Sequence, residues 1–404
     1  MKPTEAAATR PEGGLAADRV WPRRRETGQA REMSAGRWAF PLSDLEGASV
    51  EEGLLEGAQA DPPGEDAVLT TPLCDLLGCR HPILQAGMGG VARAELVAAV
   101  VEAGGYGFLG MVRESPELIA REVDAVRART QRPFGVNLIP AATDPELLAE
   151  QLAVCFEKAV HALCFFWDVD ADAVARAKSA GCRVLYQVGS VEDARAAEAA
   201  GADAIIAQGF EAGGHVRGEL TSLVLLPQVV AAVSVPVVAS GGFASGASLV
   251  AALALGAQGI HCGTAFLATE ESFAHDYHKQ RVVAACSQDT VHTDAFAINW
   301  PPSSPVRVIA NSLTKSLGPL LLGYRPEDFD RLEVARDEGR PLYRFSTDSP
   351  LRTTTGELEA LALFAGQVTG SVDRVLPAAA LMEEIVTTAH ATLRRLGRPK
   401  GDRG

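Results

Sequence analysis

From about residue 71 onward, short runs of aliphatic residues alternate with alanine-rich stretches of helical periodicity. The runs are almost continuously apolar, which is typical of parallel strands buried on both faces. Two of the intervening stretches begin at Ser or Asp followed by proline, at Ser115 and Asp144, and others end at glycine, as at Gly181 and Gly201. The pattern therefore predicts a series of strand–helix units.

Eight strands are predicted, and a helix follows each of the first seven. The strands are 82–86, 105–109, 134–139, 162–167, 183–188, 204–207, 236–240 and 259–263. The helices are 94–102, 115–130, 144–159, 170–180, 190–200, 220–233 and 245–255. Eight such units favour a (β/α)8 TIM barrel. A doubly wound sheet stays open as the alternative, because the number of strands does not show closure.

The two ends of the chain differ from this pattern. Residues 1–68 lack sustained periodicity and are rich in Ala, Gly, Glu, Arg and Pro, so we expect a largely disordered extension. The barrel domain is expected over 69–396, with the barrel core at about 80–268 and a C-terminal cap at about 269–396 that could cover the barrel mouth. The elements expected in the cap are a strand-and-loop excursion over 289–308 and helices over 356–366 and 377–396.

Composition narrows the class of protein. The formal net charge of -14 argues against nucleic acid or an anionic membrane as a partner. An apolar content of 47% is ordinary for a globular enzyme, and no apolar run is long enough to span a membrane. Seven scattered cysteines and the lack of a secretory signal favour a cytoplasmic protein without disulfides.

Two glycine turns stand where a barrel carries its function, at the C-terminal ends of the strands. Ser240-Gly241-Gly242 follows the seventh strand, and Gly263-Thr264 follows the eighth. Either turn alone would be an ordinary loop. Together, at these two strands and next to helix starts, they indicate a cradle of backbone N–H groups for a phosphate.

Three amide side chains lie at other strand ends. Asn137, Gln187 and Gln208 follow the third, fifth and sixth strands, where each could hydrogen-bond a flat heterocycle. With the phosphate cradle they suggest flavin mononucleotide (FMN). The glycines at 87–90 lack the spacing of a dinucleotide-binding fingerprint.

The histidines differ in their surroundings. His215 follows two glycines on a predicted loop, where an imidazole can accept a proton at neutral pH; the alternative is that it holds the shape of the loop. His261 lies inside the eighth strand and is interpreted as a satisfied core residue. His275 and His278 flank Asp276, but no further ligands can be placed, so no metal is predicted.

Several of these segments resemble the nitronate monooxygenase family, formerly 2-nitropropane dioxygenases. The segments are 82–88, 134–137, 208–215, 239–243 and 263–267, and the resemblance covers about residues 70–390. It implies an FMN-dependent barrel enzyme that oxidises alkyl nitronates or nitroalkanes with O2 to carbonyl compounds and nitrite. By position, His215 matches the catalytic histidine of the family. The residues that match its flavin-contacting segments are Gln85, Ala86, Gly87, Met88, Asn137, Gln187, Gly214, Gly241, Gly242, Gly263 and Thr264. Their neighbours Gln208, Gly213 and Ser240 complete the predicted cofactor site.

Other functions share these motifs. A flavin-containing enoyl-acyl carrier protein reductase that uses NAD(P)H is one alternative, and another flavin or quinone reductase is a second. A non-catalytic flavin binder is less favoured, because a binder needs no titrating His215. On a nitroalkane, His215 would act as a base or, when protonated, as a partner for the nitronate oxygens. No oligomeric state is predicted.

Overall fold

The computed structural model describes residues 69–397, and a closed barrel of eight parallel strands lies at its centre. The strands, in barrel order, are β1 (Ile83–Gln85), β2 (Tyr106–Gly110), β3 (Gly135–Leu138), β4 (Ala162–Phe166), β5 (Arg183–Val188), β6 (Ala204–Gln208), β8 (Val237–Ser240) and β9 (Ile260–Cys262). Because β9 pairs with β1, the barrel is closed and the doubly wound alternative is excluded. All eight predicted strands are confirmed. The predicted extension over 1–68 lies outside the described residues.

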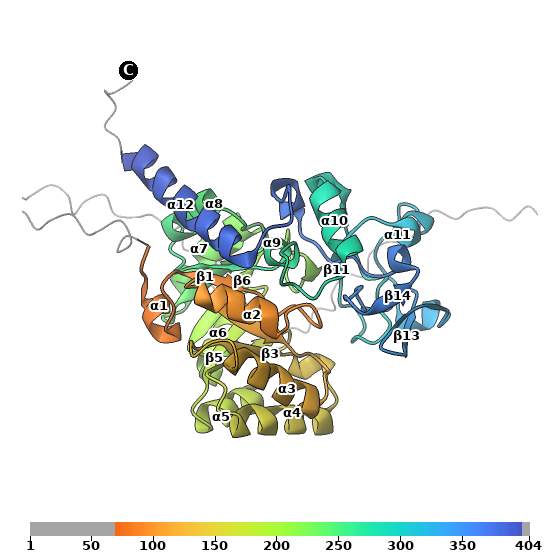
Figure 1. Ribbon diagram of the computed structural model, residues 1–404, viewed down its shortest axis with the longest axis horizontal. Helices are drawn as coiled ribbons and strands as arrows, with labels where there is room; N and C mark the ends of the chain where they lie inside the picture. Colours follow the sequence, from red (N-terminus) through yellow and green to blue (C-terminus); the bar gives the residue numbers. More distant parts are fainter. Residues whose placement is uncertain (1–68, 398–404) are drawn as a thin grey trace, which may run out of the picture. The chain divides into compact units, whose positions relative to one another are not determined.

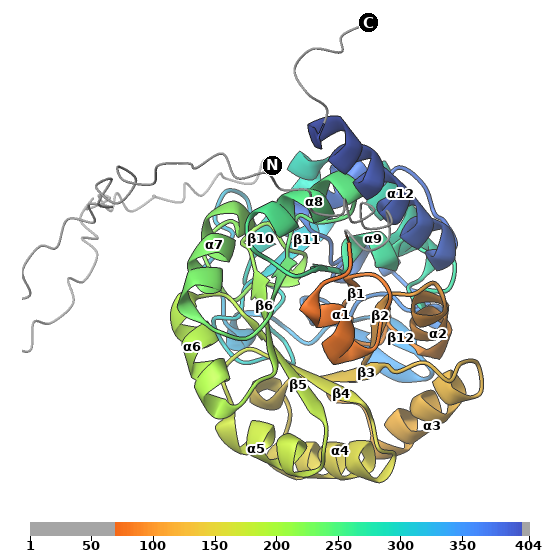
Figure 2. The same ribbon diagram turned by 90° about the vertical axis from the view of Figure 1, so that its left-hand side faces the viewer.

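A layer of large apolar side chains fills the interior of the barrel. Leu84, Phe108 and Leu185 are fully buried there, since each strand turns alternate residues inward. The short helix α1 (Pro72–Leu77) adds Leu73 and Leu77 to the same cluster, so it closes the N-terminal end of the barrel (Figure 2). With that end filled, only the C-terminal end is left for a ligand.

Helices surround the strands as the sequence predicts. They are α2 (Ala94–Glu102), α3 (Pro116–Arg127), α4 (Pro145–Glu157), α5 (Ala171–Ser179), α6 (Val191–Ala200), α7 (Ser222–Ala232) and α8 (Gly246–Ala254). The side chains of Ser115 and Asp144 accept hydrogen bonds from backbone N–H groups of the first turns of α3 and α4. These caps satisfy donors that a helix start leaves free, which explains why the helices begin there.

The eighth helix of the outer ring comes from near residue 378, more than 100 residues after the last barrel strand. Only the four-residue α9 (Thr264–Leu267) follows β9 directly, while the long α12 (Ala378–Gly397) packs against α8 and α2 (Figure 2). The helices touch closely at Gly246, where a Cβ atom would lie 2.0 Å from the backbone nitrogen of Ala389. The predicted helix over 377–396 is therefore confirmed, as an outer wall of the barrel.

The segments between α9 and α12 gather at one end of the barrel (Figure 1). They are α10 (Asp276–Ala284), β10 (Thr290–Thr293), β11 (Val306–Ile309), α11 (Ser312–Ser316), β12 (Glu333–Asp337), β13 (Arg340–Tyr343) and β14 (Thr354–Gly356). Short 3-10 turns lie at Pro140–Ala142, Ser287–Asp289, Pro326–Asp328, Leu358–Ala360 and Gln367–Ser371. The strands form two small antiparallel sheets, one of order β10-β11-β7 and one of order β13-β12-β14, where β7 is Gly214–His215.

The helix predicted over 356–366 is wrong. Gly356 has a φ of 117°, which ends β14, and one 3-10 turn follows. The apolar residues after it run beside β11, since Ile309 N donates to Leu363 O at 2.9 Å and Phe364 bridges to Val308. Pairing with a strand distant in the chain overrides the local helical pattern.

The sequence led to predictions about disulfides and about membrane-spanning segments. All seven cysteines fall within the described residues and all are free. Within residues 69–397, no helix combines the length and the apolar character that crossing a membrane requires.

Candidate active site

One large cavity opens at the C-terminal ends of the barrel strands, with a volume of about 720 Å³. Residues of the segment between α9 and α12, such as Trp300 and Phe364, line it together with the strand ends, so this segment covers the C-terminal end of the barrel. The predicted site residues that line it are Ala86, Gly87, Met88, Asn137, Gln187, Gln208, Gly213, Gly214, His215, Ser240, Gly241, Gly242, Gly263 and Thr264. Gln85 does not: its side chain is fully buried and donates to the backbone oxygens of Ala86 and Phe108.

The glycine turns have the geometry of a close backbone approach. Gly241 and Gly242 have φ values of 86° and 84°, a left-handed conformation that residues with a side chain rarely adopt. Thr264 Oγ1 accepts a hydrogen bond from Gly366 N at 3.0 Å, so its O–H stays available to donate. Both turns face the cavity, as a phosphate site requires.

The three predicted amides play different parts. Asn137 Nδ2 donates to Cys164 O at 3.0 Å, which fixes the amide and leaves its Oδ1 without a protein partner among the described residues. The side chain of Gln187 has no hydrogen-bond partner in that part of the chain. Gln208 instead holds the backbone: its Nε2 donates to His215 O at 2.9 Å, and its Oε1 accepts from Arg217 N at 3.2 Å. Asn137 and Gln187 thus remain free for a ligand, whereas Gln208 clamps the segment that carries His215.

His215 is held by a strand and not by a free loop. β7 pairs with β11, with His215 opposite Val306, and Val216 N donates to Pro305 O at 2.9 Å. The expected loop is therefore tied to the cap on one side and to Gln208 on the other. This double attachment fixes the backbone from which the imidazole projects.

Aromatic rings enclose the imidazole. The ring of Trp300 stacks on His215 with centroids 3.6 Å apart, and Trp167 meets it edge-on at 6.0 Å. Burial among these rings, with a smaller contribution from the positive charge of Arg113, lowers the pKa of His215 to about 3. Its Nε2 is buried within the cavity wall and has no protein partner among the described residues. His215 is thus neutral at physiological pH, with a nitrogen free to accept a proton.

Sequence reasoning missed the aromatic and cationic residues around His215. Trp167, Arg113 and Asn299 have φ values of 82°, 57° and 72°, and non-glycine residues rarely adopt this strained backbone except where the surroundings impose it. Trp300 stands in the irregular excursion between β10 and β11, where no periodicity marks it. Only the tertiary fold brings these residues beside His215.

The interpretation of His261 as a satisfied core residue needs correction. Its Nδ1 shares a hydrogen bond of 3.1 Å with Ser240 Oγ, but its buried Nε2 has no partner among the described residues. The residue also lines the cavity, and burial lowers its pKa to about 4. The signal available in the sequence was a polar ring inside an otherwise apolar strand.

The His275–His278 segment has a structural role. His275 Nδ1 accepts from Tyr277 N at the start of α10, and His278 Nε2 contacts Phe364 O at 3.1 Å. In the part of the chain that the structure describes, no group of three or more His, Cys, Asp or Glu side chains could hold a metal ion.

Comparison with known proteins assigns the family. The protein-family model described as nitronate monooxygenase matches residues 70–388, which is most of the chain. The chain belongs to the nitronate monooxygenase family. It is therefore a flavin-dependent oxidoreductase by family, built on the barrel that the sequence predicted.

Curated proteins that are similar in sequence to this chain carry different functional names. A Mycobacterium tuberculosis protein named (3aS,4S,5R,7aS)-5-hydroxy-7a-methyl-1-oxo-octahydro-1H-indene-4-carboxyl-CoA dehydrogenase is 38% identical over 252 residues, 62% of this chain and 68% of that protein. A probable nitronate monooxygenase of Staphylococcus saprophyticus is 32% identical over 286 residues, 60% of this chain and 79% of that protein. Membership of the family therefore does not by itself select a substrate.

Solved structures agree with the fold. FabK from Thermotoga maritima superposes with a TM-score of 0.66 and is 31% identical, over 81% of this chain and 98% of that one. The nitroalkane oxidase of Streptomyces ansochromogenes superposes with a TM-score of 0.65 and is 31% identical, over 81% of this chain and 100% of that one.

Proposed function

We propose that this chain uses FMN and O2 to oxidise alkyl nitronates or nitroalkanes to carbonyl compounds and nitrite, with His215 as the base. The observation that carries the proposal is the neutral imidazole of His215 in the cavity wall, whose Nε2 has no protein partner within residues 69–397. A protonated His215 would be the better partner for nitronate oxygens, but its lowered pKa favours the neutral form and so favours the base.

The cavity fits FMN in its chemistry. The left-handed turn at Gly241 and Gly242 and the hydroxyl of Thr264 would hold the phosphate. The unpartnered amide atoms of Asn137 and Gln187 would hold the polar edge of the flavin ring. When bound, FMN supplies the redox chemistry that oxidises the nitronate together with O2.

The protein itself supplies proton transfer and confinement. The proton on the α-carbon of a nitroalkane passes to His215 Nε2, and the electron pair of the C–H bond moves into the nitro group to give the nitronate. Trp300 and Trp167 keep the imidazole in place and exclude water from it. General-base catalysis of this kind typically contributes about 100- to 10,000-fold in rate.

A His215→Asn variant tests the proposal with two substrates. Turnover of neutral nitroethane should fall at least about 100-fold, because the proton acceptor is gone. Turnover of preformed propionate 3-nitronate should fall much less, since that substrate needs no deprotonation. Equal losses on both substrates would show that His215 binds the anion and is not the base.

His292→Asn is the matched control. His292 is also a half-buried imidazole whose Nε2 has no partner among the described residues, and burial lowers its pKa to about 4. It does not line the cavity. Its replacement should leave both turnover rates and the flavin content unchanged.

A second candidate is the dehydrogenation of a bulky, hydroxylated CoA thioester. The 38% identity to the mycobacterial CoA dehydrogenase favours it, as does a cavity of about 720 Å³ with apolar walls at Ile139, Phe166 and Leu351. The candidate functions can be distinguished by mixing the flavin-loaded protein anaerobically with one of three reductants. These are propionate 3-nitronate, a hydroxyacyl-CoA and NADH. Rapid bleaching of the flavin by the nitronate supports the proposed function, whereas bleaching by the thioester or by NADH alone supports a dehydrogenase or a reductase.

A further inference from the structure

Arg113 is a cation in the wall of the cavity that has no ion-paired carboxylate in the described part of the chain. It lies in the loop after β2, is half-buried and lines the same cavity as His215. Within residues 69–397, no carboxylate oxygen lies within 4.0 Å of its guanidinium. Moving a charge partly out of water is costly unless the charge is paired, so this half-buried position is unusual.

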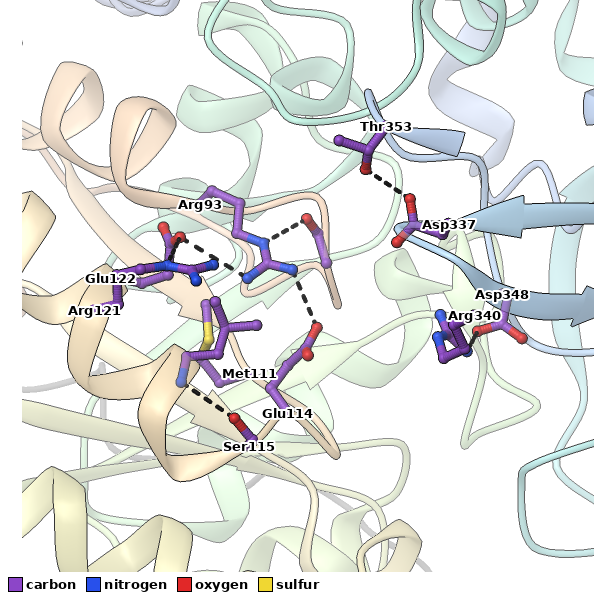
Figure 3. A network of polar contacts seen from close by, with 12 residues as sticks. Arg93, Met111, Glu114, Ser115, Arg121, Glu122, Asp337, Arg340, Asp348 and Thr353 are labelled. Carbon is purple, nitrogen blue, oxygen red and sulfur yellow. Dashed lines mark hydrogen bonds and ion pairs between the residues drawn. The ribbon is translucent and has the colours of Figure 1, made fainter. Parts of the chain in front are cut away.

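The two carboxylates that act on Arg113 from a distance are engaged elsewhere. They are Glu114 and Asp348. Glu114 pairs with Arg93 at 3.3 Å, and Asp348 pairs with Arg340 at 3.0 Å. Figure 3 shows Arg93 turned toward Glu114 and Arg340 beside Asp348. Both acids therefore already have a cation, and Arg113 does not have an acid.

Three contacts hold the guanidinium in place. Its Nη1 donates to Asn299 O, its Nη2 donates to Thr347 Oγ1 at 3.3 Å, and its central carbon lies 5.4 Å from the centre of the Trp300 ring. Only two of the five N–H groups that an arginine carries are used in this way. The backbone of Arg113 is itself strained, with a φ of 57°. An oriented and strained cation that is unpaired among the described residues, and that lies against the same Trp300 ring as His215, is suited to receive an anion.

We propose that Arg113 binds an anionic oxygen of the substrate, a nitronate or a carboxylate, beside His215. The assignment deepens the proposed function, on which it rests. When His215 removes the proton, the negative charge settles on the nitro oxygens, and the remaining N–H donors of Arg113 hydrogen-bond them. The same cation adds to the burial that keeps His215 unprotonated, because a positive charge on both would repel.

Nitrite binding tests the proposal without turnover. Calorimetric titration of the flavin-loaded protein with sodium nitrite should give an affinity that falls about 10- to 100-fold in Arg113→Gln, the usual loss for a charge-assisted hydrogen bond. Arg113→Lys keeps the charge and should recover part of the loss. Arg340→Gln is the matched control, since Arg340 lines the same cavity but is paired with Asp348, and its affinity should stay within about twofold.

A pH profile gives a second readout. The rings against His215, those of Trp300, Trp167 and Phe364, do not titrate, and Arg113 is the charged group that acts on it. Arg113→Gln should therefore move the acid limb of kcat/KM for nitroethane to higher pH, while Arg340→Gln leaves it in place.

Unchanged nitrite affinity in Arg113→Gln, with or without a loss of thermal stability, overturns the proposal and leaves Arg113 as a tether to the cap. Equal weakening in Arg113→Gln and Arg340→Gln overturns it too, since that is a general charge effect. If wild-type protein binds nitrite through Arg113 but turns over no nitronate, the proposed function fails while the anion site stands.

Discussion

Replacement of Gln208 by alanine should displace His215 without emptying the cofactor site. Gln208 is 3% exposed, and its amide holds His215 O and Arg217 N. Two hydrogen bonds contribute about 1 kcal/mol each, and buried groups left unpaired cost about 1–3 kcal/mol more, so the held loop loses about 3–5 kcal/mol. At about 1.4 kcal/mol per tenfold change, the equilibrium between the held and the displaced loop shifts by about 100- to 4000-fold.

Three measurements follow the displacement. Amide hydrogen exchange over residues 209–218 should accelerate, and kcat on nitroethane should fall more than the affinity for FMN. A displaced His215 is better solvated, so its pKa should rise from about 3 toward its ordinary 6.5 and an acid limb should enter the pH profile. Wild-type exchange and wild-type kcat in Gln208→Ala would refute the assignment of Gln208 as a positioning residue.

Asn311→Ala is the control that separates an effect on the position of His215 from a general loss of protein stability. Asn311 is 1% exposed, and its Nδ2 donates to Glu359 O at 2.8 Å and Leu361 O at 3.1 Å, so the variant loses a comparable buried clamp. It lies in the cap outside the cavity wall. Asn311→Ala should lower the melting temperature as Gln208→Ala does, but without the acid limb.

Three further outcomes are expected. Wild-type kcat/KM on nitroethane should show no acid limb near pH 6.5, because the pKa of His215 is about 3; a limb at 6.5 in a pH-rate profile would contradict the neutral base. Gly87→Ala should lower the affinity for FMN in a fluorescence titration, since the added Cβ would lie 2.2 Å from Asn137 Cβ and push that side chain away; an unchanged affinity would remove Asn137 from the flavin site. His278 is fully buried and burial lowers its pKa to about 4, so the unfolded chain takes up the proton first as pH falls through 6.5, and stability declines until about pH 4. At pH 5 this amounts to about 2 kcal/mol, and chemical denaturation of His278→Gln should show a correspondingly smaller loss between pH 7 and pH 5.

The barrel was predictable because each of its parts has a local cause. Apolar runs mark strands buried on both faces, and residues such as Ser115 and Asp144 fix helix starts within a residue or two. The order of the strands then places their C-terminal ends at one rim, so Asn137, Gln187 and the glycine turns were found from their places along the chain.

The other residues of the site are not marked by any pattern in their local sequence. Trp300 and Arg113 are far apart in sequence and meet only because the cap folds over the barrel. The segment 356–366 carries helical spacing, but its apolar side chains are buried beside β11. Gln208 was correctly placed at the cavity, but its partners on the β7 segment could not be foreseen from its residue type.

The origin of the eighth outer helix has a consequence for biosynthesis. Chains emerge from the ribosome N-terminus first, so β9 and α8 are exposed well before α12 is made. Until then, the apolar flanks of α8 and α2 that α12 covers face solvent. The barrel therefore completes its fold only after α12, which ends at Gly397, has been translated, and its nascent form should depend on chaperones during that interval.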